Sequence, residues 1–290
     1  MRRLFPPNTP PVSAPGAPAS APSAPASTSS APSAPAPDRP APEWSIEEIA
    51  DEYAYPPVGE GAGVADRWLR GNMVASLDGA IHHGGRSQPL SSKADMWIFG
   101  VLRALADVVV VGARTVRQEG YRPAKRRSGF ADRRAAAGQS PVPAIAVVSA
   151  SLELDFSAPL FTQPVVPTLL LTGSGAPADR VAQAREAGAE VIFAGEGGAA
   201  DPSRVPGLLA ERGLRRQLTE GGPTLLGEFA DAGVLDELCL SISPRIVAGS
   251  APRITNGPVL PDPDEFTLEG VLEEEGFLFT RYRRLRTITE

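Results

Sequence analysis

The chain has 290 residues, a formal net charge of −6, one cysteine and two adjacent histidines. This length suits one large domain or two small ones, and the acidic balance with a single short basic block, residues 122–127, argues against nucleic-acid binding. One cysteine excludes an internal disulfide and a thiolate metal cluster. His82 and His83 have no partners at metal-ligand spacing, so we expect no metal site.

The beginning of the chain differs in composition from the rest. Residues 6–42 hold thirteen of the 31 prolines and almost no bulky apolar side chain. Such a segment buries too little apolar surface to offset its chain entropy, so we predict a disordered, inert tail over residues 1–43. The start MRRLFPPN lacks the apolar core of a secretory signal, and no later run approaches the roughly 18 to 20 apolar residues of a membrane span. We therefore expect a soluble, cytoplasmic protein that does not bind membranes.

Ordered structure is predicted over residues 44–290 as one domain. Ser45 and Glu48 fit a capping box that opens a helix. Further helices are predicted from Ser92, from Pro177, near residues 204–212 and after Gly222. Short apolar runs typical of strands lie at residues 67–78, 107–112, 144–149, 168–173, 189–195, 215–219, 237–244 and 277–286. The alternation predicts an α/β fold with a mostly parallel sheet flanked by helices, and antiparallel strands at its C-terminal end, where the last two strands have no helix between them.

Three predicted strands end in glycine-bearing sequence, at residues 111–115, 172–175 and 220–222. Ligands in an open α/β sheet bind beyond the carboxyl ends of the strands. The three ends together predict a nucleotide-sized cleft, against the simpler interpretation that each is only a tight turn. The third end leads through Gly221, Gly222 and Pro223 into a helix, and such a junction presents backbone amides to an anion, usually phosphate.

Five motifs occur in a fixed order, namely NMVASLDGAI, GRSQPLSS, LRALADVVVVGARTVRQEGY, TEGGPTLLGEF and DELCLSISPRIVAG. Together they resemble the reductase domain of the bifunctional riboflavin-biosynthesis deaminase-reductase, and more closely its stand-alone pyrimidine reductase relatives, over most of residues 67–285. The resemblance implies a dihydrofolate-reductase-like fold, NADPH as cofactor and a homodimer. The implied reaction reduces the ribosyl group of a phosphorylated pyrimidine, 5-amino-6-(5-phosphoribosylamino)uracil, to a ribityl chain. The deaminase half needs an H-x-E and paired cysteines, which this chain lacks.

The resemblance also implies the site residues. Ser87, Arg103 and Glu220 match substrate-binding positions, and Arg122 and Arg126 compete for that of a phosphate-binding arginine. Glu220 is the main catalytic candidate, with Asp78 and Glu119 as candidates to assist protonation. The implied cofactor contacts are Val74, Pro89, Thr115, Glu119, Gly221, Gly222, Pro223, Thr224 and Leu225.

A carboxylate directly before a phosphate cradle needs an explanation. Successive residues of a strand face opposite ways, so Glu220 is predicted to face the substrate while the amides that follow face the cofactor phosphates. Two other functions stay open on the sequence alone. One is a reductase for dihydrofolate or pteridines, and the other is a non-catalytic nucleotide-binding scaffold whose proline-rich tail docks a partner.

Overall fold

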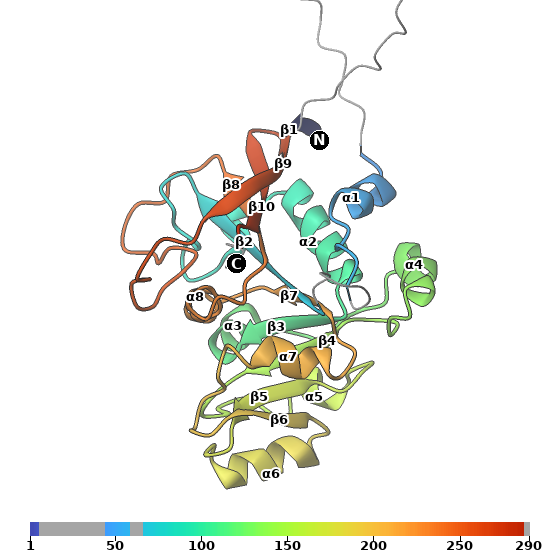
Figure 1. Ribbon diagram of the computed structural model, residues 1–290, viewed down its shortest axis with the longest axis vertical. Coiled ribbons are helices and arrows are strands. Elements are labelled where there is room, and N and C mark those ends of the chain that lie inside the picture. Colours follow the sequence, from blue (N-terminus) through green and yellow to red (C-terminus); the bar gives the residue numbers. More distant parts are fainter. Residues whose placement is uncertain (6–43, 59–65, 287–290) are drawn as a thin grey trace, which may run out of the picture.

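The computed structural model describes residues 1–5, 44–58 and 66–286, which build one sheet with helices on both faces (Figure 1). The strand order is β1-β9-β10-β8-β2-β7-β3-β4-β5-β6. The strands are β1 (Arg2–Phe5), β2 (Trp68–Ser76), β3 (Val108–Gly112), β4 (Ala144–Val148), β5 (Leu169–Gly173), β6 (Glu190–Gly195), β7 (Arg216–Thr219), β8 (Glu237–Ser243), β9 (Phe266–Glu274) and β10 (Phe277–Arg284).

The sheet divides into a parallel part and an antiparallel end. Strands β8, β2, β7, β3, β4, β5 and β6 run parallel to one another, whereas β10, β9 and β1 continue the sheet antiparallel beyond β8. The predicted fold class, a mostly parallel sheet with antiparallel C-terminal strands, is confirmed. In Figure 1 the antiparallel strands lie at the top of the view and β6 at the bottom.

Helices form where amphipathic segments follow the strands. The predicted capping box is present, because Ser45 Oγ accepts from the Glu48 amide at 3.2 Å and the Glu48 carboxylate accepts from the Ser45 amide at 2.8 Å. The α-helices are α1 (Ile46–Glu52), α2 (Lys93–Leu105), α3 (Ala113–Glu119), α4 (Ala131–Ala136), α5 (Pro159–Thr162), α6 (Ala178–Glu186), α7 (Val205–Ala210) and α8 (Pro223–Asp231), with 3₁₀ turns at Gln88–Leu90 and Ser128–Phe130.

The period-two alternation of the central strands separates two hydrophobic cores. On β3, Val109 and Val111 belong to the core that includes residues of α1, α2, α3 and α6, whereas Val108 and Val110 belong to the core that includes residues of α7 and α8. A strand covered on both faces is a continuous apolar run, which is why VVVV marked β3 in the sequence. This packing holds α2 and α8 on opposite sides of the strands that bear the site.

The structure adds elements that the sequence did not predict. Along the chain, strand β9 comes between β8 and β10, the two strands that were predicted as the last ones. Its acidic composition disfavours a strand. Arg2–Phe5, predicted as part of a disordered tail, instead pairs with β9 as β1. The rest of the predicted tail, residues 6–43, lies outside the described residues. Helices α3, α4 and α5 were also missed; each is seven residues or shorter.

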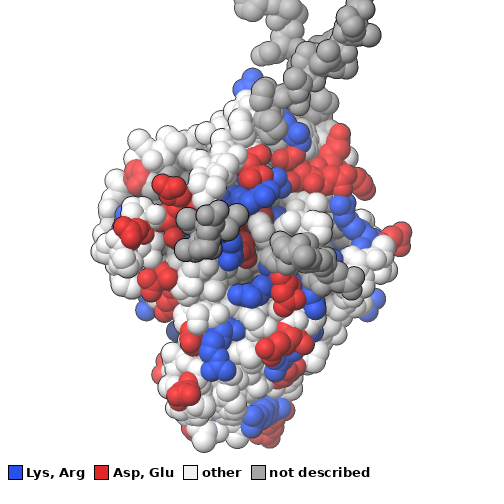
Figure 2. Space-filling view, viewed as in Figure 1, with Lys and Arg blue, Asp and Glu red and all other residues white. Residues whose placement is uncertain are grey.

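Two surface properties bear on the class of partner. Among the described residues, no helix combines the length and the apolar character needed to cross a membrane. On the face shown in Figure 2, basic and acidic side chains are intermixed rather than gathered into fields of one sign.

Candidate active site

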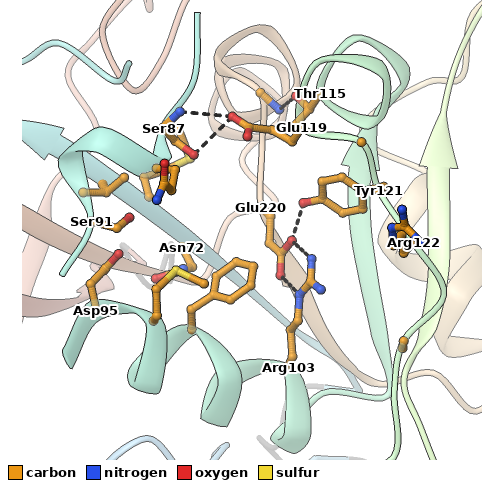
Figure 3. Close-up of a pocket in the computed structure, with 18 of the residues that line it drawn as sticks. Asn72, Ser87, Ser91, Asp95, Arg103, Thr115, Glu119, Tyr121, Arg122 and Glu220 are labelled. Atoms are coloured by element: carbon orange, nitrogen blue, oxygen red, sulfur yellow. Dashed lines mark hydrogen bonds and ion pairs between the residues drawn. The ribbon is translucent and has the colours of Figure 1, made fainter. Parts of the chain in front are cut away.

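A cavity of about 530 Å³ lies at the carboxyl ends of β2, β3 and β7, beside α2 (Figure 3). This is the position that an open parallel sheet offers to a ligand. The predicted residues that line it come from segments far apart in the sequence. They are Val74, Ser87, Arg103, Thr115, Glu119, Arg122, Glu220, Gly222 and Pro223.

Glu220 is the central acid of the cavity. Its carboxylate accepts two hydrogen bonds from Arg103, from Nε and from Nη2, each at 2.6 Å, in a bidentate pair. It also accepts a hydrogen bond from the Tyr121 hydroxyl. The Glu220 side chain is 3% exposed and that of Arg103 24%, so the arginine is the more accessible member of the pair, and both residues line the cavity. A bidentate arginine–carboxylate pair adds geometric specificity as well as energy.

The surroundings hold both partners of Glu220 in one protonation state. Burial raises the pKa of Tyr121 well above its ordinary value, and the neighbouring Glu220 carboxylate raises it further, so the phenol stays a hydrogen-bond donor at neutral pH. Burial is the largest single effect on Arg103 and lowers its pKa, but the charge of Glu220, its hydrogen bonds and the neighbouring Tyr121 together outweigh burial, so the net pKa is raised. The Arg103 guanidinium also lies 4.4 Å from the ring centroid of Phe99.

Ser87 and Glu119 meet at the edge of the cavity. The Glu119 carboxylate accepts from the backbone amide and from the hydroxyl of Ser87, both at 3.1 Å. Ser87 belongs to the loop that follows β2, and Glu119 is the last residue of α3. These contacts join the predicted substrate loop to the predicted cofactor helix, and both side chains are shown in Figure 3.

The glycine junction connects β7 to β3. The Gly112 amide donates to the Gly221 carbonyl at 2.9 Å, and the Gly222 amide donates to Thr115 Oγ1 at 2.9 Å. The peptide bond between Gly221 and Gly222 is cis. A Cβ atom at Gly222 would lie 2.8 Å from Thr115 Oγ1, closer than packed atoms allow, so the contact of Gly222 with the Thr115 side chain favours glycine at this position.

The N-terminus of α8 has the form of an anion cradle. Its N-cap, Gly222, provides no side-chain cap, and the first intrahelical bond is donated by the Leu226 amide. The amides of Thr224 and Leu225 therefore have no acceptor within the helix, and they can donate hydrogen bonds to a phosphate group. The Leu225 side chain itself is buried in the core. This junction fits the phosphates of a dinucleotide cofactor through its backbone rather than through its side chains.

Several predicted residues are not brought into the cavity. Asp78 lies outside it, where its carboxylate accepts from Ser76 Oγ at 2.5 Å and from the amides of Val247 and Ala248 at 3.2 and 2.7 Å. These contacts pin the turn after β2 to the loop after β8. Pro89, Arg126, Gly221, Thr224 and Leu225 are also absent from the cavity lining.

The strand end at residues 172–175 is likewise separate from the cavity, because it ends β5, and β4 lies between β5 and β3 in the sheet. It bonds instead to the loop after β6, through the Gly173 amide to the Gly198 carbonyl at 3.2 Å. Only two of the three glycine-bearing strand ends therefore meet at the cavity.

Besides Arg103, the cavity lining includes Arg122, Lys125, Arg127 and Arg134. Arg134 is 4% exposed; its Nη1 donates to the carbonyls of Ala104 and Ala106 at 2.8 Å each, and its Nη2 has no partner among the described residues. The guanidinium of Arg127 packs on α2, where a Cβ at Gly100 would lie 2.5 Å from Nη2. Of the two arginines that competed in the sequence, Arg122 lines the cavity and Arg126 does not.

The cavity lining also includes Asn72, Ser91, Asp95 and Tyr121, which were not predicted as site residues from the sequence. Tyr121 was included in a motif but given no role, and Asp95 has the appearance of an ordinary acid in the first turn of a helix. The signal that points to Asn72 is its place on β2 two residues before Val74, because residues i and i+2 of a strand share a face.

Known proteins share this architecture. The crystal structure of a pyrimidine reductase-like protein from Corynebacterium diphtheriae superposes with a TM-score of 0.68 at 29% identity, over 76% of this chain and 93% of that one. The 2,5-diamino-6-ribosylamino-4(3H)-pyrimidinone 5′-phosphate reductase of Archaeoglobus fulgidus is 27% identical over 64% of this chain and 84% of that protein. The enzyme of the same name from Aquifex aeolicus is 32% identical over 63% and 79%.

The class defined by the fold and the cavity is thus that of the pyrimidine reductases and their relatives. The model of the RibD C-terminal domain matches residues 67–272. The chain belongs to the RibD C-terminal domain family, as the five ordered motifs indicated.

Proposed function

We propose that this protein is an NADPH-dependent reductase that converts the ribosyl group of a phosphorylated ribosylaminopyrimidine to a ribityl chain in riboflavin biosynthesis. The observation that supports this most is the arrangement of Glu220, Arg103 and Tyr121 beside the glycine junction of α8. One short segment of chain thereby contacts both a polar substrate site and an anion cradle. Relatives that are named as reductases of such a pyrimidine phosphate support the same function.

In this proposal, different residues bind the cofactor and the substrate. NADPH, when bound, supplies a hydride to the C1′ carbon of the ring-opened ribosyl group, and a proton completes the reduction at the heteroatom attached to it. The α8 junction and Thr115 hold the cofactor side, as Val74 does on β2. Arg103 and Glu220 orient the substrate hydroxyls, and holding two reactants in register contributes much of the rate of such a transfer.

The two candidates for assisting protonation, Asp78 and Glu119, differ in where the structure places them. Asp78 accepts three hydrogen bonds outside the cavity, so we do not retain it as a catalytic candidate. Glu119 stays a candidate, because its carboxylate lies at the cavity edge on Ser87. Tyr121 keeps its proton and acts as a donor that orients Glu220. The homodimer implied by the resemblance and the cytoplasmic location expected from the sequence are part of the same proposal.

The test follows NADPH oxidation by the full chain through the absorbance of the reduced nicotinamide. Three substrates are compared: the 2-amino pyrimidinone ribosyl phosphate, the corresponding uracil, and dihydrofolate. Oxidation with either pyrimidine supports the proposal. Oxidation with dihydrofolate alone moves the protein to the folate reductases, and silence with all three contradicts a reductase function and favours the scaffold alternative.

A further inference from the structure

A tight turn in the loop after β2 gives the two adjacent histidines different surroundings. Gly84 and Gly85 have φ values of +59° and +80°, and positive φ at both central residues is typical of a two-residue type I′ turn. Beside this turn the His83 amide donates to the Arg86 carbonyl at 3.0 Å, and the Arg86 amide donates back at 3.3 Å. His82, the residue before this bridge, is half-buried and lines the cavity, whereas His83 is exposed and does not.

The loop that carries His82 connects the two sides of the cavity. Before it comes Val74, which we assign to the cofactor side. After it comes Ser87 on the substrate side, which is hydrogen-bonded to the end of α3. The Ile81 amide donates to the Pro252 carbonyl at 3.2 Å, so the chain just before His82 is attached to the loop after β8. His82 is thus held in place between residues for the cofactor and residues for the substrate.

The proposed reduction consumes a proton as well as a hydride. When the hydride bonds to C1′, the double bond between C1′ and the attached heteroatom breaks, and its electron pair stays on that heteroatom. A proton must then bond to the same heteroatom. A positioned side chain that supplies the proton accelerates such a step by about 10²- to 10⁴-fold, provided that it exchanges its proton near the working pH.

The other ionisable groups that line the cavity are poorly suited to release a proton at neutral pH. Glu220 and Glu119 accept hydrogen bonds from Arg103 and Ser87, as carboxylates do. Tyr121 keeps its proton, because burial and the Glu220 charge raise its pKa well above the ordinary value. The remaining groups are an acid on α2, which as a carboxylate only accepts hydrogen bonds, and four basic side chains of types that stay charged at this pH. They are Asp95, Arg122, Lys125, Arg127 and Arg134.

We infer that His82 donates the proton that completes the reduction. This inference rests on the proposed function and adds a catalytic residue to the same site. Histidine is the side chain that ordinarily gains and loses a proton between pH 5 and 8. Among the described residues, no hydrogen bond or ion pair occupies the His82 ring, so its N–H groups are available to a ligand.

The proton transfer balances within each turnover. An N–H bond of the His82 imidazolium breaks, and the hydrogen bonds to the heteroatom at C1′ through the electron pair that the hydride transfer left there. The imidazole becomes neutral and regains a proton from water. Because His82 is half-buried rather than enclosed, water reaches its ring between turnovers.

The first experiment compares the pH dependence of kcat in wild type, His82→Asn and His83→Asn, with NADPH and the ribosyl pyrimidine phosphate that wild type reduces. The donor must carry its proton, so wild-type kcat should fall as the pH rises from about 5 to 8. In His82→Asn we expect kcat at about pH 6 to be about 100-fold lower and the fall to disappear. His83→Asn, the same change at the next residue, should retain the wild-type kcat and pH profile. The substrate phosphate also titrates in this range, but equally with all three proteins, so the differences between the profiles are decisive.

The second experiment separates proton donation from a structural role of the loop. In His82→Ala, added imidazole replaces the lost ring, and we expect it to raise kcat more strongly at about pH 6 than at about pH 8, because only imidazolium is the donor. An unchanged pH profile in His82→Asn, or a profile lost in Glu119→Gln instead, would overturn the inference and leave the reductase proposal intact. Activity of His82→Ala that imidazole restores at neither pH would also overturn it. If wild type oxidises NADPH with neither pyrimidine phosphate, the proposed function fails, and this inference fails with it.

Discussion

In the described interior, the pair Arg103–Glu220 and the pair Arg70–Glu237 serve different purposes. Arg103 and Glu220 meet in the cavity, where the arginine side chain is 24% exposed. Arg70 and Glu237 meet at 3.0 Å between β2 and β8, with side chains 0% and 5% exposed. The first pair is open to a ligand on one side, whereas the second is closed on every side.

In the closed pair, Arg70 and Glu237, most of the possible hydrogen bonds are made with neighbouring groups of the protein. Arg70 donates to the Tyr53 carbonyl at 2.7 Å, and its guanidinium lies 4.2 Å from the ring centroid of Tyr55. Trp68 Nε1 donates to Glu237 at 2.7 Å. This pair therefore attaches the segment after α1 to the sheet. The comparison teaches that the same two residue types become a fold element or a binding element according to which donors are left for a ligand.

The largest expected effect is on the closed pair. Glu237→Gln leaves the Arg70 guanidinium buried without a counter-charge, and breaking a buried pair in this way costs about 3–5 kcal/mol. Urea denaturation followed by fluorescence measures the loss. Glu220→Gln is the matched change in the open pair and is expected to lower the free energy of unfolding by much less, because Arg103 reaches water in the cavity. Equal losses in the two variants would contradict the distinction between the pairs.

The second prediction concerns catalytic activity, for which the open pair, Arg103 and Glu220, is the important one. Glu220→Gln removes the charge that orients Arg103, and we expect kcat/KM for the pyrimidine substrate to fall about 100-fold. The affinity for NADPH, measured by quenching of tryptophan fluorescence, should stay nearly constant, because the α8 amides do not depend on this side chain. A variant that loses NADPH affinity but binds substrate normally would show that Glu220 faces the cofactor instead.

The smallest effect is predicted for Asp78, a carboxylate that belongs to neither pair. The Ser76 hydroxyl and the amides of Ala248 and Val247 lower its pKa from 3.8 to about 2. A lowered pKa in the folded state means that Asp78 stabilises the fold fully above about pH 4 and loses this contribution as the pH falls toward 2. The difference in Tm between wild type and Asp78→Asn should therefore shrink over that range, and a pH-independent difference would refute the assignment.

Much of the architecture followed from local patterns. The apolar runs predicted the parallel strands, and the turn after β7 predicted a helix beginning at Pro223, where α8 begins. The alternation of residues along a strand predicted that Glu220 would face a polar site. Acidic β9 was missed because Glu disfavours strands in the absence of a partner, and here the partners are β10 and β1.

The site was predictable only in part, for a physical reason. Ser87, Arg103 and Glu220 were found through motifs, but the sequence gives no sign that β7 lies between β2 and β3. That insertion brings Glu220, after β7, next to the loops that follow β2 and β3, whereas β4 separates the strand end at residues 172–175 from them. Asp95 was missed because a helix start favours an acid at any position in a protein, and the sequence does not show that this one lines the cavity.

The insertion of β7 also has a consequence for assembly of the protein. Strand β2 pairs with β7 and β8, although the chain between β2 and β7 carries all of β3 to β6. Contacts that join such distant segments form slowly, since the long loop between them must close first. During synthesis, β2 leaves the ribosome long before its neighbours exist. The ligand cavity is therefore among the last features to form, and no N-terminal fragment ending before β7 contains Glu220 or the α8 cradle.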